Sequence, residues 1–244
     1  RPAYGYALCL YLYDNVWIMR INPEGYKGIK INTAIFLLII AVVTATAVMY
    51  EWAWWALALV DAFLVWRIVF FIFFFREPQR PLVQQEGVVY APADGKVVAI
   101  EEVDGPEVMG GRCIQMSVYM TFYDVHVNWH PVGGEVIFKD HFDGDFILAW
   151  HPKSSALNEH TTVGVRTASG EVVAWRQIAG WIARRIVCYA EVGDRVEQNT
   201  KSGCIKFGSR VDVFVPLGSD ILVNIGDKVV GSQTELARLK KVEN

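Results

Sequence analysis

An apolar stretch at residues 33–75 constrains the fold more than any other feature of the chain. Its first part, TAIFLLIIAVVTATAVMY (33–50), carries no charged side chain over a length that can span the hydrocarbon core of a bilayer. After Glu51 the apolar sequence resumes, with Asp61 and Arg67 inside it. A charge near the bilayer centre costs about 2.5–3.5 kcal/mol on insertion scales. We therefore predict one transmembrane helix and favour a hairpin of two, with a shallow re-entrant or interfacial second helix as the alternative.

The charges around this stretch predict its orientation. Basic side chains lie on both sides of it, namely Arg20, Lys27, Lys30, Arg76 and Arg80. The turn between the two apolar parts has only an acidic residue and is followed by tryptophans typical of the headgroup region, namely Trp52, Trp54 and Trp55. By the positive-inside rule, both ends of the hairpin lie in the cytoplasm. The sequence predicts a protein of the cell (inner) membrane whose soluble part faces the cytoplasm.

Two short segments come before the apolar stretch. Residues 19–32 are expected to be a cytoplasmic N-terminal segment. Residues 1–18 precede Met19, which is a more natural start, and we interpret them as an upstream extension. The apolar stretch is too long for a cleavable signal peptide, and no small-residue cleavage site follows it.

The soluble part, residues 76–244, has the pattern of a β-rich domain. Short runs typical of strands are separated by glycine, proline and aspartate. These runs are residues 87–91, 95–102, 112–119, 133–138, 162–167, 171–178, 184–190, 211–215 and 220–223. We expect an all-β or α+β domain with a sandwich- or barrel-like fold. The only helical pattern in it is QTELARLKK (233–241).

Composition excludes several classes of function. The formal net charge is −3 and there is no basic stripe with interleaved aromatics, so a nucleic-acid partner is not expected. The four cysteines show no CxxC spacing, which favours free thiols in a reducing compartment. His126 and His130 are four residues apart, but their surroundings predict a strand and no HExxH glutamate lies between them. We therefore expect no metal.

Three short segments contain residue types that could carry chemistry. KFGSRVDVFVP (206–216) places Gly208 and Ser209 where a strand pattern begins, YAPADGKVV contains Asp94, and His126 and His130 share one side of a predicted strand. Taken singly, each segment is better explained as a turn, a bulge or a hydrogen-bonded histidine. There is no GxSxG or Walker sequence, so spacing alone does not establish a triad.

The order of these segments is more specific than any one of them. FFFREPQRP, APADGKV, YMTFYDVHVNWHP, RQIAGWIARRIV and IKFGSRVDVFVP follow one another after the apolar hairpin. In this order the chain resembles the short, membrane-attached bacterial phosphatidylserine decarboxylases from about Met19 to its C-terminus. The resemblance implies a self-processing proenzyme: the Ser209 hydroxyl attacks the Gly208 carbonyl, and the chain divides into residues 1–208 and 209–244. What remains at residue 209 is a covalent pyruvoyl group, the cofactor that supplies the electron sink provided by pyridoxal phosphate in other enzymes, and no metal is implied.

The resemblance also implies roles for the other candidates. Asp94 matches the family's aspartate, which orients a histidine, and His126 matches the histidine of the DVHVN segment, the main candidate for proton transfer. Longer members have a second histidine where this chain has Trp129, and His130, one place further on, is expected only to assist His126. In LNEHTTVG, His160 replaces a usual arginine, which puts any charge contact there in doubt.

The implied reaction is decarboxylation of phosphatidylserine in the bilayer to phosphatidylethanolamine and CO2, through a Schiff base with the pyruvoyl group. Implied partners are the membrane and the cleaved chain 209–244, with a homo-oligomer possible. Arg76, Arg80 and Arg210 could contact the lipid headgroup, although solvated surface positions explain them more simply. The alternatives are the same chemistry on an ether-linked phosphoserine lipid, and a non-catalytic, membrane-tethered module of the biotinyl or lipoyl kind. The latter needs an exposed lysine between small residues or methionine in a tight turn, and the sequence has none.

Overall fold

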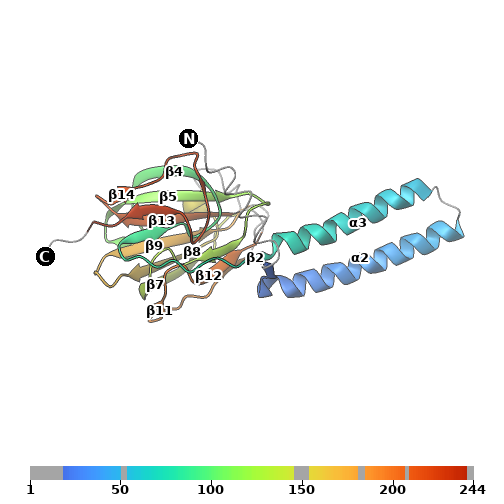
Figure 1. Cartoon of the computed structure of the whole chain (residues 1–244), viewed down its shortest axis with the longest axis horizontal. Coiled ribbons are helices and arrows are strands. Elements are labelled where there is room, and N and C mark those ends of the chain that lie inside the picture. The colour runs from blue at the N-terminus through green and yellow to red at the C-terminus, as the bar shows by residue number, and fades with distance from the viewer. Residues whose placement is uncertain (1–18, 51–53, 146–153, 181–184, 207–208, 241–244) are drawn as a thin grey trace. The chain divides into compact units, whose positions relative to one another are not determined.

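The chain divides into two structural units, one ending at Gln79 and one beginning at Arg80. The computed structural model describes residues 19–50, 54–145, 154–180, 185–206 and 209–240 (Figure 1). The proposed extension at residues 1–18 and the glycine at position 208 therefore lie outside the described residues.

The first unit is a pair of long helices closed by a short β-ladder. Helix α2 (Pro23–Met49) and helix α3 (Trp54–Phe74) run antiparallel and side by side (Figure 1). Strand β1 (Met19–Ile21) pairs with β2 (Arg76–Pro78) at their base. The side chain of Asn22 accepts a hydrogen bond from the amide of Glu24 and Pro23 follows it, which is a typical helix start.

Both helices are long and apolar enough to cross a membrane. Helix α2 begins about ten residues before the predicted apolar run, and α3 is continuous through Asp61 and Arg67. Many of the large apolar side chains on the pair are exposed, among them Leu37, Leu38, Leu59, Phe63 and Val69. Exposed apolar surface of this extent is typical of contact with lipid or another apolar partner.

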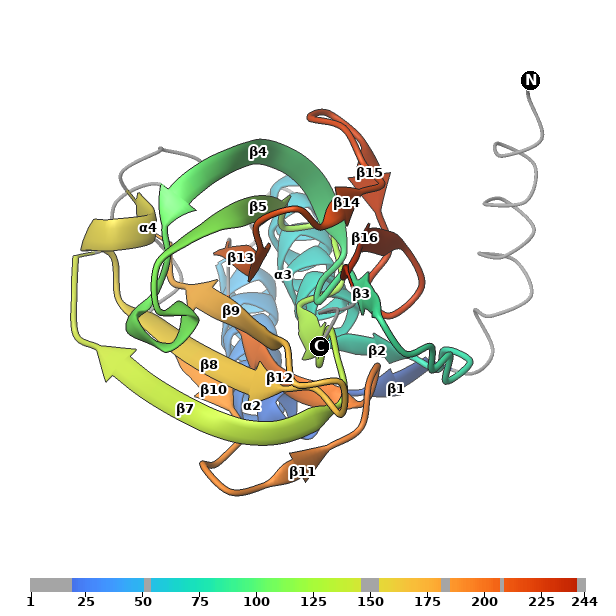
Figure 2. The same ribbon diagram turned by 90° about the vertical axis from the view of Figure 1, so that its left-hand side faces the viewer.

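The second unit is built on a curled antiparallel sheet of eight strands, ordered β11-β7-β8-β9-β13-β5-β4-β15 (Figure 2). Its strands are β4 (Gly95–Asp104), β5 (Arg112–Met120), β7 (Gly134–Phe142), β8 (His160–Arg166), β9 (Val172–Ile178), β11 (Arg195–Val196), β13 (Ser209–Pro216) and β15 (Lys228–Val229). Strand β13 is central, paired along its length with β5 and with β9.

Two three-stranded sheets complete the unit. One is ordered β10-β12-β6, with β10 (Ile186–Cys188), β12 (Lys201–Ile205) and β6 (Val127–Trp129). The other is ordered β14-β16-β3, with β14 (Asp220–Ile221), β16 (Glu235–Arg238) and β3 (Val88–Tyr90). A 3-10 turn, η2 (Glu107–Met109), and a short helix, α4 (Ser154–Leu157), connect the strands.

The main core lies on one face of the curled sheet. Val211, Val213 and Val215 alternate along β13 and face this core, with Met116, Val118 and Trp175 from the neighbouring strands. Side chains from the two small sheets, such as Val89, Ile205 and Ala237, belong to the same cluster. The period of two in VDVFV therefore gives the interior face of β13 directly.

The expected β-rich domain is confirmed, and each of the nine predicted strand segments overlaps a strand. The helix predicted at 233–241 is wrong, because residues 235–238 form β16 and pair with β3 and β14. Leu236 and Ala237 in this strand are wholly buried in the core. Burial of neighbouring residues on a sheet has overridden a sequence with good helix formers.

Candidate active site

Ser209 is the first residue of the central strand β13 and is wholly buried. It pairs with Met120, the last residue of β5, and its Oγ lies 3.8 Å from the Met120 sulfur. Ser209 continues the row of Val213 and Val211 on the core face of the sheet. Because thioether sulfur is a weak acceptor, the hydroxyl is held in an apolar environment with little competition for its proton.

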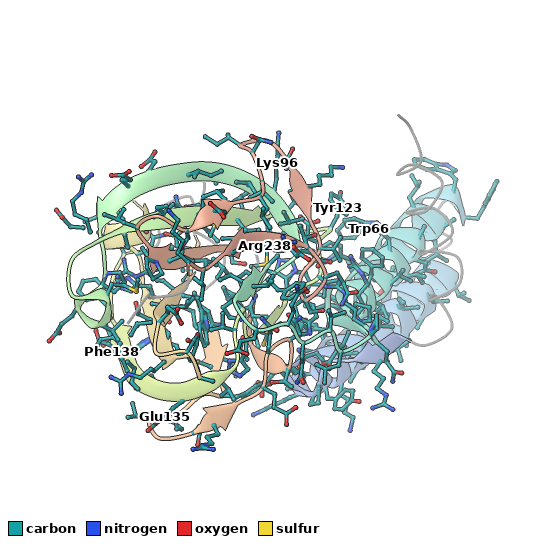
Figure 3. The ribbon with its side chains drawn as sticks, turned by 60° about the vertical axis from the view of Figure 1, so that its left-hand side comes forward. Trp66, Lys96, Tyr123, Glu135, Phe138 and Arg238 are labelled. Atoms are coloured by element: carbon teal, nitrogen blue, oxygen red, sulfur yellow. The ribbon has the colours of Figure 1, made fainter. Side chains whose placement is uncertain are left out.

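The turn after β5 leads from Met120 to His126. The backbone amide and the hydroxyl of Thr121 both donate to the carboxylate Oδ2 of Asp124 over 2.7 Å, which closes a tight turn. Tyr123 on this turn lies on the same side of the unit as Lys96 at the start of β4, away from Glu135 and Phe138 on β7 (Figure 3). The turn thus fixes the chain between the residue beside Ser209 and the candidate base.

His126 is almost entirely buried, and its tautomer follows from its neighbours. Its Nδ1 lies 2.9 Å from the backbone carbonyl oxygen of Asp124. A carbonyl oxygen can only accept, so in the neutral ring Nδ1 carries the hydrogen and Nε2 carries the lone pair. The backbone carbonyl of His126 accepts from the amide of Ile205, at the end of β12. His126 is therefore fixed at the ring and at the backbone.

Strand β6 and the residue after it contact β9 through Asn128 and His130. Val125, Val127 and Trp129 form a cluster on one face, so residues 126, 128 and 130 face the other way. On that face, the His130 ring meets Trp175 at a centroid distance of 5.3 Å, and Asn128 accepts a hydrogen bond from Gln177. A step of two residues to lower numbers along β6 therefore matches a step of two residues to higher numbers along β9.

The same register can be followed along the strands to the position of His126. Trp175 pairs with Val213, and Gln177 pairs with Val211, so the same step leads along β13 to Ser209 and along β6 to His126. One such step beyond the observed contacts, the rows reach Ser209 on β13 and His126 just before β6. The expected partnership of these two residues remains a prediction.

His130 lies elsewhere. It is level with Trp175 and Val213, four residues or about 13 Å along β13 from Ser209. Burial lowers its pKa to about 4, so the ring is neutral at physiological pH. Its backbone amide donates to Thr200, and its carbonyl accepts from Asn199. Its predicted helper role remains a prediction.

Asp94 is bound to a cation. Each carboxylate oxygen is 2.7 Å from a guanidinium nitrogen of Arg80, and Oδ1 also accepts from the amide of Gly231 at 2.8 Å. The Arg80 guanidinium lies 4.4 Å from the centre of the Trp129 ring. The described contacts of Asp94 thus lie on the Trp129 side of β6, opposite to His126, and its predicted role in orienting the histidine remains a prediction.

The interpretation of Arg80 and Arg210 as solvated surface residues is wrong. The Arg80 side chain is 6% exposed and ion-paired with Asp94. The Arg210 side chain is 4% exposed, pairs with Asp212 at 2.6 Å and donates to the Ser117 hydroxyl. Both arginines are therefore already engaged inside the β-rich unit.

A family model described as phosphatidylserine decarboxylase matches residues 68–237. The chain belongs to the phosphatidylserine decarboxylase family. It is 48% identical over 189 residues to the phosphatidylserine decarboxylase proenzyme of Porphyromonas gingivalis, covering 75% of this chain and 86% of the relative. It is 41% identical over 224 residues to the proenzyme of Parabacteroides distasonis, covering 91% and 100%. The proenzyme of Symbiobacterium thermophilum is 40% identical over 200 residues, covering 82% and 92%.

At two positions, Trp129 and His160, the sequence departs from the family pattern, and the structure shows what these side chains contact. Trp129, in place of the second histidine of longer decarboxylases, supports the Arg80 guanidinium that pairs with Asp94. His160 is buried, stacks on Phe142 and has a pKa lowered by burial, so it does not supply the positive charge of an arginine.

Several site residues were missed by sequence reasoning. Asp124, Met120 and Gln177 contact the reactive pair or its strands. Methionine and glutamine do not signal chemistry, and Asp124 contacts His126 through its backbone carbonyl, which residue type does not reveal. Only the Thr121-x-x-Asp124 spacing, which is typical of a side-chain-closed turn, could have indicated one of them. In the described part of the chain, no group of three or more metal-ligating side chains is gathered.

Proposed function

We propose that this chain converts phosphatidylserine into phosphatidylethanolamine and CO2 with a pyruvoyl group made from its own Ser209. Membership of the decarboxylase family and the proenzyme names of its relatives support the reaction. The observation that carries the site is Ser209 itself, a wholly buried serine at the first position of a central strand.

Self-cleavage begins with the serine. The lone pair on Nε2 of His126 takes the Ser209 hydroxyl proton as Oγ attacks the carbonyl carbon of Gly208. The peptide nitrogen leaves with a proton, so an ester replaces the amide. Removal of the residue 209 Cα proton then breaks the Cβ–O bond and releases the Gly208 carboxylate. The dehydroalanine left at 209 takes up one water and loses ammonia to become the pyruvoyl group.

The buried setting suits this sequence of steps. Because Ser209 is shielded from solvent and lies beside a thioether, water competes little with its hydroxyl for the preceding carbonyl carbon. Glycine at 208 lets that carbonyl be approached closely because it has no Cβ. The hydrogen bond from Nδ1 to Asp124 keeps the basic nitrogen of His126 on the other side of the ring.

In turnover, the pyruvoyl group supplies an electron sink for the bond that breaks as CO2 leaves. His126 is the candidate to return a proton to the substrate α-carbon. The two apolar helices are proposed to anchor the chain as a hairpin in the cell membrane with the β-rich unit on the cytoplasmic side, where a diacyl lipid can be met.

The deciding experiment measures cleavage of the polypeptide together with decarboxylation. The purified full-length protein should give two fragments on a denaturing gel, with the short one starting at residue 209 and blocked to amino-terminal sequencing. It should release CO2 from vesicles containing phosphatidylserine, and hydride reduction of its carbonyl should abolish that activity. A Ser209→Ala variant should remain one chain and be inactive.

Ser219→Ala is the matched control. Ser219 is also buried and lies in the same short fragment, but its hydroxyl donates to the Pro216 carbonyl. This variant should cleave and decarboxylate as the wild type does. An active wild-type preparation that is uncut and has no hydride-sensitive carbonyl would refute the proposal.

A further inference from the structure

Asn128 and Gln177 form a side-chain bridge inside the β-rich unit. The amide nitrogen Nε2 of Gln177 donates to Oδ1 of Asn128 over 2.9 Å, and both residues are wholly buried. They come from the segments DVHVNWH and RQIAGW, which are far apart in the sequence. The chemistry described above gives neither of them a part.

Neighbouring strands leave space for the glutamine end of this bridge. Nε2 of Gln177 also lies 3.3 Å from the carbonyl oxygen of Val187 on β10. A Cβ atom on Gly203 of β12 would be 3.1 Å from Nε2 and would collide with the Val187 carbonyl oxygen. A glycine is therefore needed where β12 passes the bridge.

The bridge leaves one polar atom of each side chain unpaired. Nδ2 of Asn128 and Oε1 of Gln177 are buried without a hydrogen-bond partner among the described residues. Buried polar atoms without partners cost stability, and two apolar side chains of similar size would avoid that cost. Stability alone thus gives no reason for these two amides.

The position of the bridge does give a reason. His126 lies two residues before Asn128, just ahead of β6, and Ser209 lies two residues before Val211, which pairs with Gln177. Each step of two residues is about 7 Å along its strand. Among the described residues, the bridge is therefore a direct hydrogen bond between β6 and β9 that lies one step of two residues before the reactive end.

We infer that Asn128 and Gln177 are positioning residues that hold the His126 imidazole level with the Ser209 hydroxyl. This inference rests on the proposed function, because self-cleavage is the reaction in which the two meet. Neither amide has to touch the reacting atoms. A directional hydrogen bond fixes the register of β6 against β9 more tightly than apolar packing, and a misplacement of about 1 Å can slow a reaction by about a hundredfold.

The test separates positioning from stability. In the Asn128→Leu/Gln177→Met double variant, apolar side chains replace both amides. Made in the Ser209→Ala background, where every protein stays one chain, the double variant should unfold within a few degrees of its parent. Made with Ser209 present, it should form the 209–244 fragment about ten- to a hundredfold more slowly than the wild type.

Gln198→Met is the matched control. Gln198 is a buried glutamine whose Nε2 donates to the carbonyls of Val88 and Pro131, away from the reactive end. This variant should unfold at a lower temperature and still cleave at the wild-type rate. Cleavage of the folded double variant at the wild-type rate would overturn the inference. So would cleavage rates that simply follow the unfolding temperatures of the wild type, the double variant and Gln198→Met. Failure of the wild type itself to cleave would count instead against the proposed function.

Discussion

The Nδ1 atom of His126 lies 2.9 Å from the backbone carbonyl oxygen of Asp124, within a turn that the Asp124 side chain closes. In a catalytic triad, a carboxylate holds the corresponding nitrogen and so sets the tautomer. A backbone carbonyl can do the same without adding a charge to the site. The orientation of the proposed base is thus coupled to the fold of the turn from Thr121 to Asp124.

His126→Ala is expected to slow formation of the short fragment by about 10²–10⁴-fold, the usual contribution of a general base. The rate is measured by the loss of full-length chain after synthesis. His141→Ala is the control, because His141 is half-exposed and bonds to Thr161 on the neighbouring strand. Equal rates in the two variants would remove His126 from the cleavage step.

Arg80→Met and Asp94→Asn are expected to behave alike. Each breaks a largely buried ion pair and should lower the free energy of unfolding by about 3 kcal/mol, because the remaining partner is left without its counter-charge. Denaturant unfolding in the Ser209→Ala background measures the loss. With Ser209 present and under conditions where both are folded, both should cleave at similar rates.

This comparison tests the role that the family resemblance gives to Asp94. If its carboxylate orients a histidine, Asp94→Asn alone should stop cleavage while Arg80→Met cleaves. That result would contradict a purely structural role, in which the Asp94 carboxylate only pairs with Arg80 and accepts from the amide of Gly231.

The fold could be predicted where alternation and burial agree. VDVFV in β13 has a period of two and lies on the core face as expected. The segment ELAR is a strand and not the predicted helix because it pairs with β3, from the other end of the unit. Such long-range pairing leaves no local signal.

In the candidate site, too, some residues could be predicted from the sequence and others could not. Ser209 and His126 could be selected from residue type and from the order of the segments, and their partnership remains a prediction. Asn128 and Gln177 could not, since an amide pair becomes visible only when β6 is laid over β9. Arg80 was misjudged because a buried guanidinium and a solvated one look the same in a sequence.

The short fragment, residues 209–244, is expected to stay bound after cleavage. Its strand β13 is hydrogen-bonded to β5 on one side and β9 on the other, and its Val211, Val213 and Val215 are wholly buried. Both fragments should therefore elute together from a sizing column in native buffer and separate only in denaturant. Release of the short fragment without unfolding would contradict the central placement of β13.

His130 is expected to make the folded state sensitive to acid. Its folded pKa is about 4 because of burial, whereas an exposed histidine titrates near 6.5. Between these values the unfolded chain binds a proton that the folded chain does not, so stability is complete above about pH 6.5 and falls as the pH drops towards 4. The loss from this residue is on the order of 3 kcal/mol.

A His130→Leu variant removes this titration and keeps an apolar side chain against Trp175. Its free energy of unfolding, measured in the Ser209→Ala background, should change less between pH 6.5 and 4 than that of the parent. The difference between the two curves isolates His130 from the other groups that titrate in this range, among them His160, whose pKa burial also lowers. Parallel curves would mean that the His130 ring is protonated in the folded protein, and a charged ring there would need a partner other than Trp175.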